Sequence, residues 1–377
     1  MTAAVRPAGH PPAPEPAAER LLRTPAGRAV AGHLGEAVVR ADLATALQVV
    51  DAAVHAAPLV IPPAMADVFS GGKRIRPLLV VATARAAAAS GPRTARAALG
   101  PLRPPPTTGR RPGAPPLVGY GRVALAAAAV ELLHLASLVH DDIMDEAPTR
   151  HGVGTISARG GTGLALVAGD YLLGHAHAAA AALGAGGLLA RSLVRLCEGQ
   201  AEEWSTTFDP RRTVPSYYAA IGGKTAALVE AATRLGALAA RHSPRTTAAL
   251  GRFGHHLGLA FQLRDDLLDL TATADTLGKP VGHDLANGVY TYPTLWALRY
   301  EPALAPLLRA RSGRAPDQAL THRAAELVRR SGGLEATRRA IRHHQGRCLT
   351  ALSAAEGLAP EGVTLLADLT EAVLQGG

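Results

Sequence analysis

An apolar pattern with helical spacing runs from near Ala31 to Leu374, and only short stretches with glycine or proline interrupt it. Alanine and leucine, both strong helix formers, dominate the composition, whereas aromatic residues make up only 3%. Long stretches also lack the alternation of β-branched residues that strands need. We therefore predict an all-α fold with one domain over residues 31–377.

Two segments depart from this pattern. Residues 1–30 mix proline, alanine, arginine and glutamate without the apolar centre of a signal peptide, so we predict a flexible Pro/Ala-rich tail there. Between residues 91 and 119, prolines and glycines are too dense for a continuous helix. We predict a proline-rich surface loop over 91–119.

The chain carries a formal net charge of +9, which suggests a polyanionic partner. Nucleic-acid sites that stack bases need aromatic side chains, and this chain has few, so we expect no nucleic-acid partner. A small polyanion such as a diphosphate fits the charge, and so does a set of solvated surface arginines. Charge alone does not choose between them.

The two cysteines, Cys197 and Cys348, lie far apart and form no paired metal-ligand motif. A disulfide scaffold and a zinc site are both unexpected, and the compartment that we predict is the reducing cytoplasm. The most apolar stretch, residues 123–139, contains Glu131 and His134 and falls short of the ~20 apolar residues of a membrane span. We expect no transmembrane helix and at most peripheral membrane contact.

Six aspartates form two copies of one pattern: Asp141, Asp142 and Asp145 in LVHDDIMDE, and Asp265, Asp266 and Asp269 in FQLRDDLLDL. On a helix, the first and last aspartates of each copy share a face, about 5 to 6 Å apart at Cβ, where like charges repel. Magnesium would compensate, because it takes oxygen ligands from one or two carboxylates plus substrate phosphates. One cluster alone could be a solvated acidic face, whereas two matching clusters on apolar helices favour a metal site.

Lysine is rare in this chain, because only three of its 39 lysines and arginines are lysines. They are Lys73, Lys224 and Lys279, and each directly follows a glycine. Glycine permits close backbone approach, and lysine offers a compact charge to a phosphate. The GGKT segment at Lys224 resembles a phosphate-binding P-loop only superficially, because the earlier glycine and the preceding strand are missing.

Around Lys73, the segment GGKRIRP adds Arg74, Arg76 and Pro77. Pro77 suits the first turn of a helix, so exposed amide groups and three cations could face one anion. A solvated basic turn is the alternative. We favour anion binding, because the acidic clusters need a phosphate partner.

Five segments occur in the order found in trans-isoprenyl diphosphate synthases: GGKRIRP, HDDIMDEAPTRHG, GGKTA, FQLRDDLLD and GKPVGHDL. The chain resembles this family over roughly residues 35–375. The resemblance implies an all-α bundle of long helices around a central cavity, of the isoprenoid synthase type, usually as a homodimer. It also implies a prenyltransferase that condenses an allylic diphosphate with isopentenyl diphosphate by magnesium-assisted ionisation.

The resemblance also assigns roles to individual aspartates. It implies three magnesium ligands, Asp141, Asp145 and Asp265, with three ions typical of the family. The other three aspartates, Asp142, Asp266 and Asp269, would support the clusters or bind through water.

The same resemblance implies two substrate sites. The isopentenyl diphosphate site is expected at Lys73, Arg76 and His134; without the resemblance, His134 would be an ordinary half-buried histidine. The allylic diphosphate site is expected at Arg150, Lys224, Thr225, Gln262 and Lys279, with Gln200 as a further candidate.

One position departs from the family pattern. The family usually has two arginines after the first aspartate cluster, and here the second is His151. Histidine carries charge only when protonated, so it is a weaker cation at a position that normally helps to bind isopentenyl diphosphate. We expect weaker affinity for that substrate.

Product length in this family depends on the residues one turn before the first aspartate cluster, where bulky aromatics close the cavity. Here these positions are Ala136 and Ser137. The resemblance therefore implies an open tunnel and a product of geranylgeranyl length or longer, and the segment GVYTYPTL also looks like that of long-chain polyprenyl synthases.

Two other functions stay open. A class I terpene cyclase shares the first aspartate cluster and the helical fold, but it normally carries an Asn/Ser/Glu-type second metal motif, unlike the residues from Asp265 to Asp269. A non-catalytic subunit of a heteromeric prenyl synthase should have lost metal or phosphate residues, and both acidic clusters are intact here. His151 is the main feature that keeps the subunit hypothesis open.

Overall fold

The computed structural model describes residues 15–86, 120–271, 282–310 and 318–375. Apart from one antiparallel pair of two-residue strands, β1 (Thr149–Arg150) and β2 (Val153–Gly154), every regular element in these ranges is helical. The predicted all-α class is therefore confirmed. The loop predicted at 91–119 lies outside the described residues.

The N-terminal helices correct one prediction. Residues assigned to a flexible tail form α1 (Ala17–Leu22) and the first half of α2 (Pro25–Leu34). Helix α2 begins with a proline, and Thr24 caps it by accepting a hydrogen bond from a first-turn amide. Leu21 and Val30 are buried, which contributes about 1.5–3 kcal/mol for each side chain and offsets the cost of ordering. The prediction was wrong because it relied on the proline-rich composition of this segment and overlooked the helical spacing of its apolar residues.

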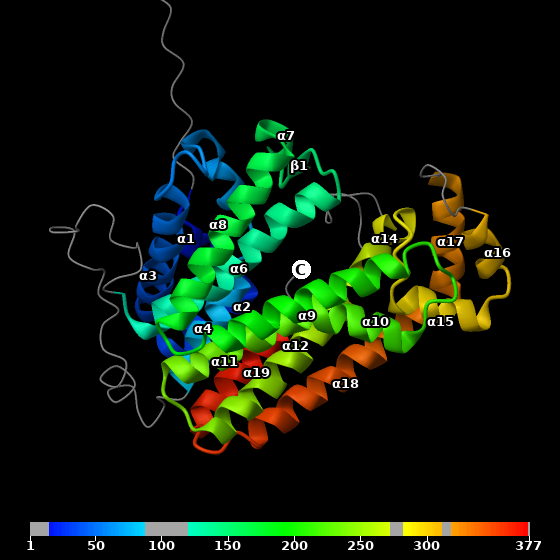
Figure 1. The fold of residues 1–377 in the computed structure, drawn as a ribbon. Helices are drawn as coiled ribbons and strands as arrows, with labels where there is room; N and C mark the ends of the chain where they lie inside the picture. The colour runs from blue at the N-terminus through cyan, green and yellow to red at the C-terminus, as the bar shows by residue number, and fades with distance from the viewer. Residues whose placement is uncertain (1–14, 87–119, 272–281, 311–317, 376–377) are drawn as a thin grey trace, which may run out of the picture.

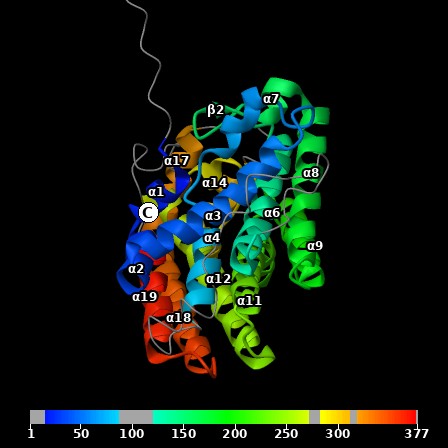
Figure 2. The same cartoon turned by 90° about the vertical axis from the view of Figure 1, so that its left-hand side faces the viewer.

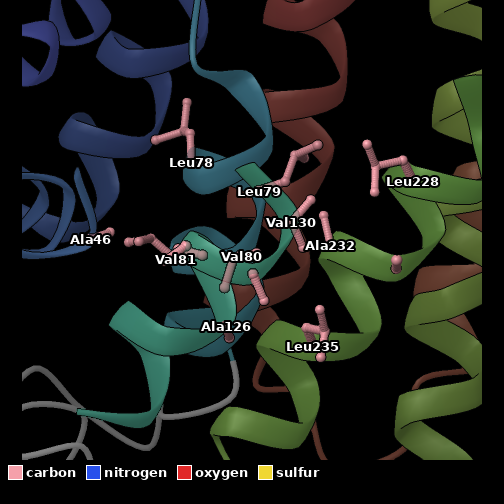
Figure 3. Packing of buried hydrophobic residues seen from close by; sticks show 14 of the residues in the cluster. Ala46, Leu78, Leu79, Val80, Val81, Ala126, Val130, Leu228, Ala232 and Leu235 are labelled. Carbon is pink, nitrogen blue, oxygen red and sulfur yellow. The ribbon is translucent and has the colours of Figure 1, made fainter. Parts of the chain in front are cut away.

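Helix α6 (Arg122–Met144) lies at the centre of the fold and packs against four others: α3 (Glu36–His55), α4 (Ile75–Ala86), α8 (Thr162–Ala181) and α11 (Ala227–Ala239). Its segment from Ala124 to Val130 is mostly alanine and completely buried, because small side chains let neighbouring helices approach closely. Figure 3 shows Val80 of α4, Ala126 of α6 and Leu235 of α11 meeting in this core.

By length and composition, α6 is also the one described helix that could span a membrane. Its most apolar window is 78% buried inside the fold, as in the core helix of a globular bundle. The apolar character of α6 is therefore accounted for by packing within the chain.

Four more long helices complete the bundle: α9 (Gly186–Ser205), α12 (Pro244–Thr271), α18 (Gly333–Ser353) and α19 (Pro360–Gln375). Helix α12 packs between α11 and α18, and α9 contacts α8 and α11 (Figure 1). In the view turned by 90°, α2 and α19 lie at one edge of the molecule and α8 and α9 at the other, with α3 and α4 between them (Figure 2).

A second apolar cluster includes α10, part of α12 and the helices from α14 to α17, at the end of the molecule away from α1 to α4 (Figure 1). These helices are α10 (Val214–Ile221), α14 (His283–Ala286), α15 (Tyr292–Tyr300), α16 (Leu304–Arg309) and α17 (Gln318–Arg330). Tyr217 and Leu263 are buried in this cluster, so α10 and α12 are held together beside the second aspartate motif.

Three short elements shape the loops near the two aspartate motifs. They are the 3-10 helix η1 (Pro63–Phe69), α7 (Ile156–Gly160) and the π-helical turn η2 (Gly222–Ala226). π-helical turns are rare and often occur at functional sites. The segment GGKTA, predicted to bind phosphate, forms this turn.

Candidate active site

The first aspartate motif ends helix α6. Asp141 is half-buried, Asp142 is buried, and Asp145, which caps the helix, is exposed. The negative end of the helix dipole disfavours three carboxylates at this position. Burial raises the pKa of Asp141, and Asp145 raises it further while Lys224 opposes the change. The motif therefore needs a cation, and its oxygen donors suit magnesium.

Asp142 supports the motif through an ion pair. It is only 2% exposed, and Nε and Nη2 of Arg150 both lie 2.8 Å from its Oδ1. Arg150 belongs to β1, and the next residue, His151, turns the chain toward β2 with a positive φ of 52°. The buried ion pair thus fixes the turn that carries His151.

A cavity of about 360 Å³ is lined by the GGKRIRP segment, α6, α12 and the β1–β2 turn. It brings together five residues predicted to bind substrate: Lys73, Arg76, His134, Arg150 and His151. Asp265 of the second motif lines it as well. The resemblance grouped Arg150 with Lys224 and Thr225, which line a different cavity, and its role in binding the allylic diphosphate stays a prediction.

All three cations of the GGKRIRP segment line this first cavity, but Arg74 already has a carboxylate partner, so two are left for a ligand. The guanidinium of Arg74 is buried, where it donates to Glu131 of α6 and to the carbonyl of Phe69. Arg74 therefore anchors the segment to the central helix. Lys73 is exposed, and Arg76 is the second cation at the cavity.

The deeper side chains of the first cavity have shifted proton affinities. Burial lowers the pKa of Arg76, although Glu131 and Asp265 act against that change. Burial also holds the pKa of His134 well below its ordinary value, and the nearby arginines, Arg76 first, lower it further. The imidazole is therefore neutral near pH 7 and can donate one ring N–H to an anion.

The second aspartate motif lies within α12, and its three carboxylates differ in exposure. The Asp265 side chain is 43% exposed, whereas Asp266 and Asp269 are each 2% exposed. Asp269 accepts a hydrogen bond from the backbone amide of Asp284 at 3.2 Å and so connects α12 to α14. Asp265 is the member best placed to bind a metal ion.

A chain of hydrogen bonds fixes Asp266. Thr225 donates to Gln262 Oε1 at 2.7 Å, Gln262 Nε2 donates to Asp266 at 3.0 Å, and the Tyr217 hydroxyl donates to Asp266 at 2.5 Å. Burial raises the pKa of Asp266 to about 8, with Asp284 as a further cause, and the two hydrogen bonds to the carboxylate act against this rise. This series of hydrogen bonds orients the Gln262 amide, which was predicted to bind the allylic diphosphate beside the second motif.

The π-helical turn η2 positions Lys224. A Cβ atom on Gly223 would lie 2.3 Å from the carbonyl oxygen of Arg195, and one on Gly199 would lie 2.4 Å from the Lys224 amide nitrogen. The two glycines therefore let η2 touch α9, rather than letting a ligand approach the backbone. Lys224 Nζ reaches Glu203 of α9 at 2.8 Å.

Charge around Lys224 keeps it protonated. Burial by itself would lower the Lys224 pKa, but Glu203 first, then Asp141 and Asp145, raise it overall. The ammonium group of Lys224 therefore lies within electrostatic reach of the first aspartate motif.

A second cavity, of about 710 Å³, joins the two motifs. The predicted residues that line it are Asp145, Gln200, Lys224, Thr225, Gln262 and Asp266. Gln200 is 8% exposed, and its Oε1 has no hydrogen-bond partner among the described residues. Lys279, the remaining predicted residue, lies outside the described part of the chain.

Among the residues of the second cavity that sequence reasoning missed are Glu203, Arg212 and Tyr217. Glu203 lies one helical turn after Gln200, so the helical spacing of CEGQAEE could have indicated it. Arg212 and Tyr217 belong to no repeated pattern, and only the fold brings them to the cavity.

The arrangement fits a magnesium site that is completed by substrate. Within the described ranges, no three His, Cys, Asp or Glu side chains converge closely enough to hold a metal ion. Magnesium usually binds proteins through one or two carboxylates together with substrate phosphates, so a split donor set on two helices suits it better than a complete cage.

The residues predicted to set product length lie on α6, one turn before the first motif. Ala136 is fully buried, and half-buried Ser137 donates a hydrogen bond to the His134 carbonyl at 2.8 Å. Neither residue lines the two cavities described above. The open tunnel at this position stays a prediction.

Comparison with known proteins gives consistent matches. A model of the polyprenyl synthetase family matches residues 59–328. Nonaprenyl diphosphate synthase from Mycobacterium tuberculosis is 34% identical over 321 residues, which cover 83% of this chain and 88% of that protein. Heptaprenyl diphosphate synthase component 2 from Geobacillus stearothermophilus is 41% identical over 183 residues, which cover 48% of this chain and 57% of that protein.

The fold matches solved structures as well. The crystal structure of polyprenyl synthase from Caulobacter crescentus CB15, complexed with calcium and isoprenyl diphosphate, aligns with a TM-score of 0.73 and 27% identity. The alignment covers 96% of this chain and 99% of that one. The predicted bundle of long helices is thus confirmed as the architecture of such enzymes.

Proposed function

Because the chain belongs to the polyprenyl synthetase family and is therefore a prenyltransferase, we propose that it condenses an allylic diphosphate with isopentenyl diphosphate. The all-trans product is of geranylgeranyl length or longer. The second cavity supports this proposal, because Asp145 and Asp266, from separate motifs, line the same space as Lys224. Carboxylates on two helices beside an ammonium group suit a diphosphate bound through divalent cations.

The first cavity is assigned to isopentenyl diphosphate. Lys73, Arg76 and His151 provide donors for its diphosphate, and neutral His134 adds one N–H. Apolar side chains of the same cavity, Leu135, Leu138 and Phe261, exclude water from the carbocation that the allylic substrate forms. Attack by the isopentenyl double bond and loss of a proton then give the extended alkene.

The second cavity is assigned to the allylic diphosphate. Asp145 lines this cavity and Asp265 lines the first one. Together with Asp141, they would hold magnesium, expected as three ions, which would supply positive charge to the departing diphosphate. The ammonium group of Lys224 adds a positive charge beside the diphosphate that the protein itself provides. Gln262 and Thr225 are positioned by their mutual hydrogen bond beside Asp266.

The test is to incubate the purified chain alone with Mg²⁺, isopentenyl diphosphate and farnesyl diphosphate, and to analyse the product by mass. A chain-extended diphosphate that disappears when EDTA removes the metal supports the proposal, and its mass gives the product length. Cyclic hydrocarbon would identify a terpene cyclase instead. No turnover would favour a subunit of a heteromeric synthase, the class to which component 2 of the Geobacillus enzyme belongs by name.

We further propose a homodimer in the cytoplasm, with at most peripheral membrane contact. Large apolar side chains are exposed on two adjacent helices: Leu166 and Val167 on α8 at 51% and 52%, and Val194 on α9 at 56%. Exposed apolar surface of this kind suits a second copy of the chain. Both cysteines are free thiols, which agrees with a reducing compartment.

A further inference from the structure

Arg212 lies in the segment between α9 and α10 and lines the second cavity. The residue is 7% exposed. Nη1 donates to the carbonyl of Tyr290 at 3.1 Å, and the group lies over the Tyr217 ring, 5.7 Å from its centroid. The other two nitrogens, Nε and Nη2, have no hydrogen-bond partner in the part of the chain that the structure describes.

The backbone around Arg212 is fixed. Its amide donates to the Asp209 carbonyl at 3.0 Å, and the Phe208 amide donates to the Gly288 carbonyl at 2.8 Å. Together with the bond to Tyr290, these contacts attach the segment to the chain before α15. The orientation of the guanidinium is therefore set by the fold before any ligand binds.

A buried guanidinium group normally has a carboxylate partner, because an unpaired buried charge is costly. Each of the three other buried arginines in the described ranges has a carboxylate partner. Arg74 pairs with Glu131, Arg85 with Asp42, and Arg264 with Asp265 at 3.8 Å. Arg212 forms no ion pair within the described ranges. Burial lowers its pKa, and Glu203 and Asp266 act against that change only from a distance.

The unpartnered atoms indicate what kind of ligand is missing. Nε and Nη2 form one edge of the planar guanidinium, and this edge binds two oxygens of a phosphate or carboxylate side by side. Lys224 and the two aspartate motifs line the same cavity, so the ligand there is an anion that also accepts metal ions. A diphosphate meets both requirements.

We propose that Arg212 is a substrate-binding residue that holds the diphosphate of the allylic substrate through its Nε and Nη2 edge. This inference rests on the proposed function and adds a cation that none of the predicted motifs contains. The bound diphosphate neutralises the buried charge of Arg212. As the diphosphate leaves the allylic carbon and gains negative charge, the fixed guanidinium stabilises it.

The test compares Arg212→Gln with Arg211→Gln, which removes the same charge from the neighbouring residue. Arg211 is a suitable control because its side chain is 88% exposed and pairs with Asp209. Binding of inorganic pyrophosphate in the presence of Mg²⁺ is followed by thermal unfolding. We expect the apparent Kd to rise about 10- to 100-fold in Arg212→Gln and to stay unchanged in Arg211→Gln.

Two further measurements separate binding from a structural role. Without ligand, Arg212→Gln should melt no lower than the parent chain, because the substitution removes an unpaired buried charge. In steady-state assays, its KM for farnesyl diphosphate should rise while its KM for isopentenyl diphosphate stays the same. An unchanged pyrophosphate affinity, or equal increases in both KM values, would overturn the assignment.

The outcome stays interpretable if that variant does not fold, or if the proposed function is wrong. Arg212→Lys keeps the charge but loses the two-nitrogen edge, so it should bind pyrophosphate more weakly than the parent; equal affinity would refute the proposal. If the parent chain extends no substrate but binds pyrophosphate in an Arg212-dependent manner, the proposed function fails and the site assignment stands.

Discussion

His151 lines the first cavity at the position where the family resemblance led us to expect an arginine, and its replacement tests how much that charge matters. We expect His151→Arg to lower KM for isopentenyl diphosphate about 3- to 10-fold, because arginine is always charged and offers more donors. KM for the allylic substrate should not change. The measurement is initial rate against each substrate at pH 7.5.

The matched control is His322→Arg, since His322 is exposed on α17 and lies in neither cavity. An equal KM for isopentenyl diphosphate in His151→Arg and in His322→Arg would mean that residue 151 does not contact this substrate.

At the scale of elements, the contact between η2 and α9 depends on a glycine. Gly223→Ala should destabilise the fold by about 1–3 kcal/mol, because its new Cβ would overlap backbone atoms of α9. It should also reduce turnover, since Lys224 is the next residue. Chemical denaturation and product assays measure the two effects.

The adjacent Gly222 provides the control, because a Cβ there meets no atom within 4 Å. Gly222→Ala should change stability by no more than about 0.5 kcal/mol. Equal losses in both variants would show that helix geometry, rather than the contact with α9, requires the glycines.

The interface between α12 and α18 contains a pair of histidines. Nδ1 of His256 lies 3.1 Å from Nδ1 of His344, so the two rings cannot both be protonated in this contact. Burial is the largest cause that lowers the pKa of each to about 4, and their mutual contact and the neighbouring residues His255, His343 and Arg347 contribute to the same shift.

This pair predicts a pH dependence of stability. Unfolded histidines bind protons below a pH of about 6.5, whereas the folded pair does so only near 4. The unfolded state therefore binds more protons between these values, and the free energy of unfolding falls as the pH drops through them. The measurement is chemical denaturation at pH 7.5 and at pH 5. The free energy of unfolding should fall less between these pH values in the double variant His256→Gln/His344→Gln than in the parent chain. In His322→Gln, which changes an exposed histidine, it should fall as much as in the parent chain.

At the scale of the whole molecule, the proposed dimer predicts a change of mass. Val167→Glu places a charge on the exposed apolar face of α8 and should convert the dimer to a monomer, as measured by light scattering after gel filtration. Leu349→Glu on α18 is the control, because Leu349 is 51% exposed and lies outside that face. A monomeric parent chain would contradict the dimer itself.

Local patterns predicted much of this molecule, because helix class and motif spacing depend on neighbouring residues. The spacing of alanine and leucine predicted the helical class, and the motifs predicted several charged and polar residues of both cavities. Contacts between distant segments were not predictable. The sequence indicated that Arg74 was free to bind an anion, whereas in the fold it pairs with Glu131 of α6, 57 positions away. Arg212 is held at the second cavity by a hydrogen bond to the carbonyl of Tyr290, 78 positions away.

The unequal exposure of the lysines has a practical consequence. Of the two lysines in the described ranges, Lys73 is exposed at the first cavity, whereas Lys224 is ion-paired with Glu203 and has a raised pKa. An amine-acylating reagent should therefore label Lys73 much faster than Lys224. Isopentenyl diphosphate should protect Lys73, so that peptide mass spectrometry could footprint occupancy of the first cavity without any enzymatic turnover.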